Sequence, residues 1–164
     1  MPRGEIRNTR ARESQGRRAG FASRLAAGAI DAGVIFGTYI GVLFVVGVLR
    51  FLFDNESLHL PRPDRGVTVV VIIVIGVIEL STAWSGSGRT VGDDVVGLRV
   101  ITASGATLGS GRAFVRAVLV MGTLGLVLLT VLVSKRNNGV HDWLCGTTVI
   151  YEWRPQHRQT RPPE

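Results

Sequence analysis

The 164-residue chain has little of several residue types, and each shortage excludes a class of protein. It has one cysteine, Cys145, so no intrachain disulfide can form. In the glycine-rich run GSGRTVG, Gly92 is followed by Asp93 and not by the Lys-Ser/Thr pair that ends a phosphate-binding P-loop. His141 and Asp142 have no third metal ligand nearby in the sequence, and no serine lies in a nucleophile motif. We therefore predict neither an enzyme nor a metal site, and no bound cofactor.

Long uncharged apolar blocks are what the sequence has instead. Hydrophobic residues make up 46% of the chain, and the 19% that are charged are separated from them. Leu25–Leu49 contains Asp31 as its only charge and is long enough to cross a bilayer. Val67–Trp84 predicts a second membrane helix. The third block, Ala113–Val133, has the length of a plain span, but it also fits a re-entrant segment bent near Gly122.

The polar segments complete a predicted α-helical membrane protein with a small β-hairpin. We expect a basic disordered arm over 1–20, a membrane domain over 21–153 and a polar tail over 154–164. The arm is rich in arginine, which favours a cytoplasmic N-terminus in contact with anionic lipid. This interpretation is favoured over binding of nucleic acid by the arm. The run VVGLRVITASGATL predicts a hairpin turning at Ser104-Gly105. A further strand over Thr147–Trp153 needs partners, and the strands around Val96–Thr102 are the obvious ones.

Four charged residues are predicted to share one layer near the inner membrane surface. With the N-terminus inside, Asp31 and Glu79 lie at similar depth in two antiparallel helices. Arg24 precedes Asp31 by two helical turns on the same face, and Arg116 enters the same layer from the third block. These charges form either an ionic clasp between helices or an ion or substrate site, and the sequence favours neither.

Glycines recur every fourth residue in the first apolar block, at Gly33, Gly37 and Gly41. This is the spacing at which membrane helices pack closely, and the stripe lies roughly opposite the face of Arg24 and Asp31. It indicates a packing surface for another helix, which could belong to a second subunit.

Several of these motifs, in this order, resemble the RDD family of small bacterial multipass membrane proteins. The family is named for one arginine and two aspartates, which Arg24, Asp31 and Asp142 match. The segment HDWLCGTTV resembles the family pattern around its second aspartate, with Cys145 where alanine is usual. The segment GRTVGDDVVGLRVITASG resembles another family stretch, with Asp93 where lysine is typical. RAFVRAVL places Arg116 at a further family arginine.

The resemblance covers about residues 20–152 and implies a modest function. The family has been associated with transport of unidentified ligands, and some members with sodium/proton antiport. We therefore expect a multipass plasma-membrane protein that takes part in ion or small-solute transport, as a homo-oligomer or within a larger membrane complex. The alternative is a membrane scaffold or accessory subunit that transports nothing.

Overall fold

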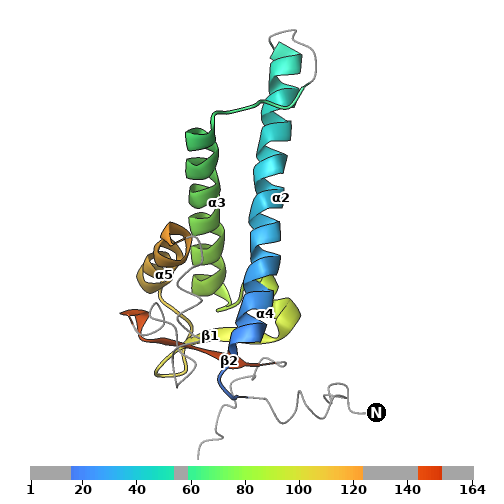
Figure 1. Cartoon of the computed structure of the whole chain (residues 1–164). Helices are drawn as coiled ribbons and strands as arrows, with labels where there is room; N and C mark the ends of the chain where they lie inside the picture. The colour runs from blue at the N-terminus through green and yellow to red at the C-terminus, as the bar shows by residue number, and fades with distance from the viewer. Residues whose placement is uncertain (1–15, 54–58, 124–143, 153–164) are drawn as a thin grey trace, which may run out of the picture.

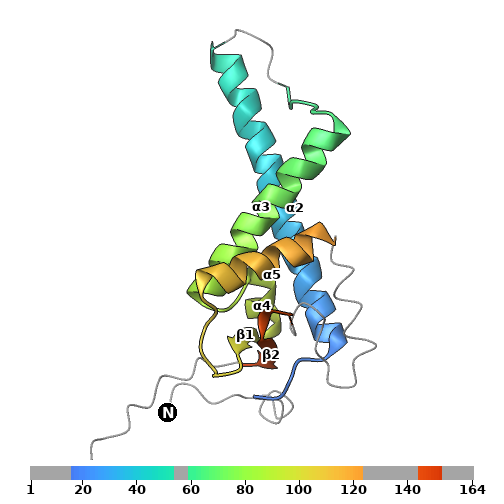
Figure 2. The same cartoon turned by 90° about the vertical axis from the view of Figure 1, so that its left-hand side faces the viewer.

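Two long helices cross each other, and the remaining elements gather at one end of the pair (Figure 1 and Figure 2). The computed structural model describes residues 16–53, 59–123 and 144–152. Its elements, in chain order, are α2 (Phe21–Phe53), α3 (Arg65–Gly86), α4 (Val91–Val96), β1 (Leu98–Thr102), α5 (Ser110–Gly122) and β2 (Thr147–Tyr151). We call α4, β1, β2 and residues 16–20 the base.

Helices α2 and α3 are both long and apolar enough to cross a membrane, as the sequence predicts. Their 33 and 22 residues correspond to about 50 and 33 Å of helix. Large apolar side chains project outward from both, among them Phe36, Phe44, Val70 and Ile78. So much exposed apolar surface is suited to a hydrocarbon environment, as expected of helices that cross a membrane.

The base contains a sheet in which β1 and β2 run antiparallel, with Leu98 opposite Tyr151 and Thr102 opposite Thr147. Alternate side chains face the helices, so Leu98, Val100 and Val149 are buried. The other edge of β2 is hydrogen-bonded to the segment before α2, where Arg18 forms a bridge to Ile150. This segment belongs to the predicted basic arm. The rest of the arm, residues 1–15, and the predicted tail lie outside the described residues.

The predicted hairpin between the second and third apolar blocks is not confirmed. A turn does form at Ser104-Gly105, where Gly105 has φ +79° and donates to the Thr102 carbonyl at 2.9 Å. Residues 106–109 nevertheless form no strand, and residue 96 belongs to α4. The partner of β1 is β2, the long-range pairing that the sequence predicts. Pairing of two distant strands that bury side chains in one core therefore outweighs the local turn signal.

A third span is likewise not confirmed. Helix α5 leaves the base and rises across α3 (Figure 2), where Met121 fills the space beside Gly76. Arg116 of α5 donates a hydrogen bond to Thr147 at the start of β2. The chain therefore begins α5 and resumes β2 at the same end of the α2–α3 pair. The intervening residues 124–143, which include Asp142, lie outside the described residues.

Candidate functional site

The carboxylate of Asp31 is bound by α4 through both of its oxygens. The Thr90 hydroxyl donates to one oxygen at 2.6 Å, and the Gly92 backbone N–H donates to the other at 2.7 Å. Asp31 lies about three turns into α2 and is half-buried. The short helix α4 thus provides the neutral hydrogen-bond donors that a carboxylate needs away from water.

Glycine at position 92 is what allows α4 to approach α2 so closely. A Cβ built on Gly92 would lie 2.0 Å from the Ala27 carbonyl oxygen and 2.9 Å from the Asp31 carboxyl carbon. Backbone atoms of α2 cannot move aside, so any other residue would push α4 away. The contact between Asp31 and α4 therefore requires glycine at this position.

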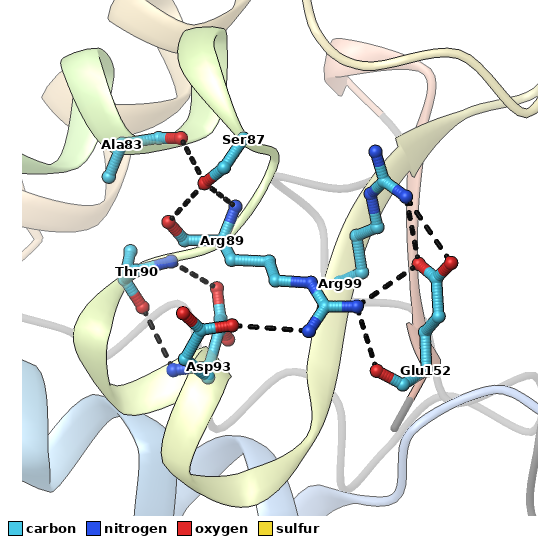
Figure 3. A network of polar contacts seen from close by, with 8 residues as sticks. Ala83, Ser87, Arg89, Thr90, Asp93, Arg99 and Glu152 are labelled. Atoms are coloured by element: carbon cyan, nitrogen blue, oxygen red, sulfur yellow. Dashed lines mark hydrogen bonds and ion pairs between the residues drawn. The ribbon is translucent and has the colours of Figure 1, made fainter. Parts of the chain in front are cut away.

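Thr90 and Asp93 form a capping box at the start of α4. Asp93 donates its backbone N–H to the Thr90 hydroxyl at 3.1 Å, and Thr90 donates its own to the Asp93 carboxylate at 3.2 Å (Figure 3). Trp84 donates its indole N–H to the same Asp93 oxygen at 3.3 Å. A six-residue helix is too short to be stable alone, so these caps determine that α4 forms here.

Asp93 is a buried carboxyl with only 7% of its surface exposed. Burial raises its pKa above the ordinary value, and this effect exceeds the opposing ones. The opposing effects, which favour the carboxylate, are the hydrogen bonds from Thr90 and Trp84 and the positive charge of Arg116. Asp93 thus lies in an environment that favours proton uptake more than water does.

Arg116 closes the site from the side of α5. Its guanidinium lies over the Trp84 ring, 4.7 Å from the centroid, and donates to the Thr147 hydroxyl at 2.6 Å. A buried guanidinium stacked on an aromatic ring and hydrogen-bonded is held in one position. Arg116 therefore fixes the positive charge that faces Asp93.

The two arginines and two carboxylates predicted to share one layer are only partly brought together. Among the described residues, the hydrogen bonds of Asp31 come from Thr90 and Gly92, not from an arginine as the sequence led us to expect. Arg24 is buried on α2 two turns before Asp31. Asp142, the third residue of the predicted family cluster, lies outside the described residues. The positive charge of Arg116 acts on Asp93.

Glu79 extends the polar region away from the base along the seam between α2 and α3. Its carboxylate accepts a hydrogen bond from Thr38 of α2 at 2.6 Å, and its charge also acts on Asp31. The glycine stripe takes no part in this seam. Within the described residues, no atom lies within 4 Å of the Cβ position of Gly33, Gly37 or Gly41.

An ion-pair cluster joins the elements of the base to one another (Figure 3). The buried Glu152 carboxylate pairs with Arg99 of β1 at 3.0 Å and with Arg89 at 3.4 Å. Arg89 also pairs with Asp94 of α4 at 3.1 Å and donates to the Glu152 backbone carbonyl at 2.8 Å. We call Arg89, Asp94, Arg99 and Glu152 the clamp. It joins the end of β2 to both flanks of α4.

Sequence reasoning passed over Thr90, Trp84 and Asp93 as site residues. From the sequence, Asp93 stands out only as a departure from a family lysine, and Trp84 only as the end of the second apolar block. A local signal was available, because a threonine followed three residues later by an acidic residue is a capping-box pattern. Nothing local indicated that the resulting helix would pack on Asp31, which lies 59 residues from Thr90.

The fold and the site together define a class: a pair of membrane-length apolar helices with a carboxylate in one of them, closed at one end by a polar α/β base. A family comparison is consistent with this, since the model of the RDD family matches residues 18–146. The chain belongs to the RDD family. The matched range includes Arg24, Asp31 and Asp142. No curated protein and no solved structure matches the chain.

Proposed function

We propose that this protein takes part in ion or small-solute transport across the plasma membrane, by exchanging a cation for protons with Asp31 at its centre. The observation that carries the proposal is that, among the residues that the structure describes, both oxygens of the Asp31 carboxylate accept hydrogen bonds from neutral donors, Thr90 and Gly92. An ionic clasp between helices would neutralise the carboxylate with a guanidinium. A carboxylate held by neutral donors inside a membrane-length helix instead keeps its charge available for exchange.

Glu79 is the second carboxylate of the proposed route. It is bonded to Thr38, two turns beyond Asp31 on α2, so the polar groups form a track along the helix seam. Charged residues inside membrane segments are costly, and two at neighbouring depths support a functional role. We propose that the positive charges of Arg24 and Arg116 determine the electrostatic potential around Asp31 and Glu79.

The topology that accompanies this proposal places the base in the cytoplasm. The arginine-rich N-terminus is adjacent to the base, and positive residues mark the cytoplasmic side. Because α5 starts and β2 ends at the base, a re-entrant third segment returns the chain to that side. The sequence leaves a re-entrant segment and a plain span open, and the β1–β2 pairing favours the re-entrant segment.

The proposed assembly is a homo-oligomer or a larger membrane complex. The two membrane helices enclose little volume by themselves, and the stripe of Gly33, Gly37 and Gly41 is open to a neighbouring helix. We propose that this stripe packs against another subunit, while the face carrying Asp31 packs on α4.

Cation/proton exchange in everted vesicles tests the transport proposal. Vesicles with wild-type protein should exchange faster than empty ones, and Asp31→Asn should remove the difference. Asp94→Asn is the matched control, because Asp94 is an exposed carboxylate on the same short helix that does not contact Asp31. Equal exchange in wild-type, Asp31→Asn and empty vesicles would refute transport and favour the non-transporting scaffold.

A further inference from the structure

An open cavity lies where helix α5 leaves the base. Its volume of about 750 Å³ falls within the range of roughly 300–1,000 Å³ that is typical of small-molecule sites. Its walls are the first turns of α5, the turn that follows β1 and the residues just before β2. None of the residues that line it belongs to α2, α3 or α4, so the cavity is separate from the contacts of Asp31.

The lining of this cavity combines one positive charge with apolar side chains. Arg112, at the third position of α5, is exposed, and within the described residues its guanidinium has no hydrogen-bond or ion-pair partner. No acidic residue is among the described residues that line the cavity. Val115 and Leu144, which are also exposed, form its apolar part. The cavity therefore suits a ligand that carries both a negative charge and an apolar group.

The apolar part of the cavity continues along the exposed face of α5. Phe114 and Val118 are exposed, and both lie on the side of Val115, because residues three and four apart share a helix face. Helix α5 rises from the base across α3, which is long and apolar enough to cross a membrane (Figure 2). A hydrocarbon chain that starts at the cavity can therefore pass Phe114 and Val118 into the apolar layer around α3.

From this arrangement we propose that the cavity binds the phosphate-bearing headgroup of an anionic phospholipid, with one acyl chain lying along Val115 and Val118. Arg112 donates to the phosphate oxygens, because a planar guanidinium matches the geometry of a phosphate group. The space around Arg112 holds the rest of the headgroup. The proposal does not depend on transport, since the site shares no residue with the proposed exchange route of Asp31 and Glu79.

Two pairs of variants separate this site from a general attraction of lipid to a basic protein. Arg112→Gln removes the charge of the cavity, and Arg17→Gln removes an exposed positive charge of the base that does not line the cavity. Gly111→Leu fills the cavity and keeps every charge, because a Cβ on Gly111 meets no described atom within 4 Å. Gly109→Leu adds the same side chain at an equally open position that does not line the cavity.

Native mass spectrometry of the detergent-solubilised full-length protein counts the lipids that bind as phosphatidylglycerol is added. Wild-type protein should bind one phosphatidylglycerol more tightly than it binds phosphatidylcholine. Arg112→Gln should weaken this binding by roughly tenfold or more, the contribution expected of a hydrogen bond to a charged group. Gly111→Leu should also weaken it, whereas Arg17→Gln and Gly109→Leu should stay within about twofold of wild type.

Several results would overturn the proposed lipid site. Equal losses in Arg112→Gln and Arg17→Gln would mean that net charge alone attracts the lipid. Unchanged binding in Gly111→Leu would mean that the lipid does not enter the cavity, and equal binding of the two lipids would mean that the site does not select an anion. Inorganic phosphate that displaces phosphatidylglycerol at the same concentration would assign the cavity to a soluble phosphate. If Gly111→Leu does not fold, the comparison of Arg112→Gln with Arg17→Gln decides the question.

Discussion

Burial governs how the Asp93 side chain behaves. Its carboxyl is surrounded by α4, Trp84 and Arg116, and the loss of water raises its pKa despite the hydrogen bonds and the positive charge. The folded protein therefore binds a proton at Asp93 more tightly than the unfolded chain does. Stability linked to this group is greatest at acid pH and falls as pH rises from about 3.8 through the higher folded pKa.

We predict that Asp93→Asn flattens this dependence. The asparagine oxygen can accept from the Thr90 N–H, as the protonated acid does, but it cannot ionise. The thermal midpoint of wild-type protein in detergent should fall as pH is raised from about 4 to 7, and that of Asp93→Asn should fall less. Parallel pH profiles for the two proteins would contradict the assigned environment.

Asp31 shows how far the role of a single residue, and the identity of its partners, can be predicted from the sequence. Asp31 was identifiable because a charge inside an apolar block is conspicuous. Its partners were not, because Thr90 and Gly92 reach it through a long-range contact that no periodicity encodes. The expectation of an arginine partner followed from charge alone. Among the described residues, the hydrogen bonds to Asp31 come instead from Thr90 and Gly92.

Helix α4 depends on its contacts more than on its intrinsic propensity. It has six residues, begins with a capping box and ends at Gly97, whose φ of +76° is favourable only for glycine. One of its residues must be glycine because it rests directly on the backbone of α2. Packing on α2 thus stabilises a helix that would not form alone.

Gly92→Ala should separate α4 from α2. The added methyl group would overlap the Ala27 carbonyl, and overpacking of this kind costs roughly 1–3 kcal/mol or more. We expect a clear loss of thermal stability together with loss of exchange. Gly86→Ala is the control, because a Cβ there meets no described atom within 4 Å, and its effect should stay within about 1 kcal/mol. Similar midpoints for the two variants would show that α4 tolerates displacement.

The clamp holds β2 against α4 and β1. Glu152 is 5% exposed and faces two guanidinium groups, so Glu152→Ala leaves both without this partner. We expect a loss of roughly 1–3 kcal/mol in the free energy of unfolding. In a double-mutant cycle with Arg99→Ala the two losses should be less than additive. Strict additivity would mean that the ion pair contributes nothing to stability.

For the whole molecule, the two apolar helices and the pairing of the last strand with β1 were predictable, and the packing of α4 against α2 was not. Length and apolar content identify α2 and α3 without tertiary information. The base combines a local turn with a pairing between distant strands, and the distant pairing prevails because it buries Leu98, Val100 and Val149 together. The side of the membrane on which the third apolar block ends depends on that pairing. The sequence of the block alone therefore left both a plain span and a re-entrant segment open.

Cysteine labelling tests the proposed arrangement of the chain. In a Cys145→Ala background, an impermeant thiol reagent should label Arg62→Cys in intact cells, since the segment before α3 lies at the end of the helix pair away from the base (Figure 1). Ser104→Cys and Leu144→Cys, both exposed at the base, should react only after the membrane is permeabilised. Labelling of Leu144→Cys in intact cells would instead place the end of the chain outside.

The bridge between Arg18 and Ile150 has a consequence for biosynthesis. The β2 strand pairs on one edge with residues synthesised near the start of the chain and on the other with β1. A ribosome therefore releases both membrane helices for insertion before the strand that completes the base exists. Throughout that interval the edge of β1 is open, and the clamp lacks Glu152. Nascent chains truncated before residue 147 should accordingly be recognised by quality-control proteases, although their helices are fully inserted.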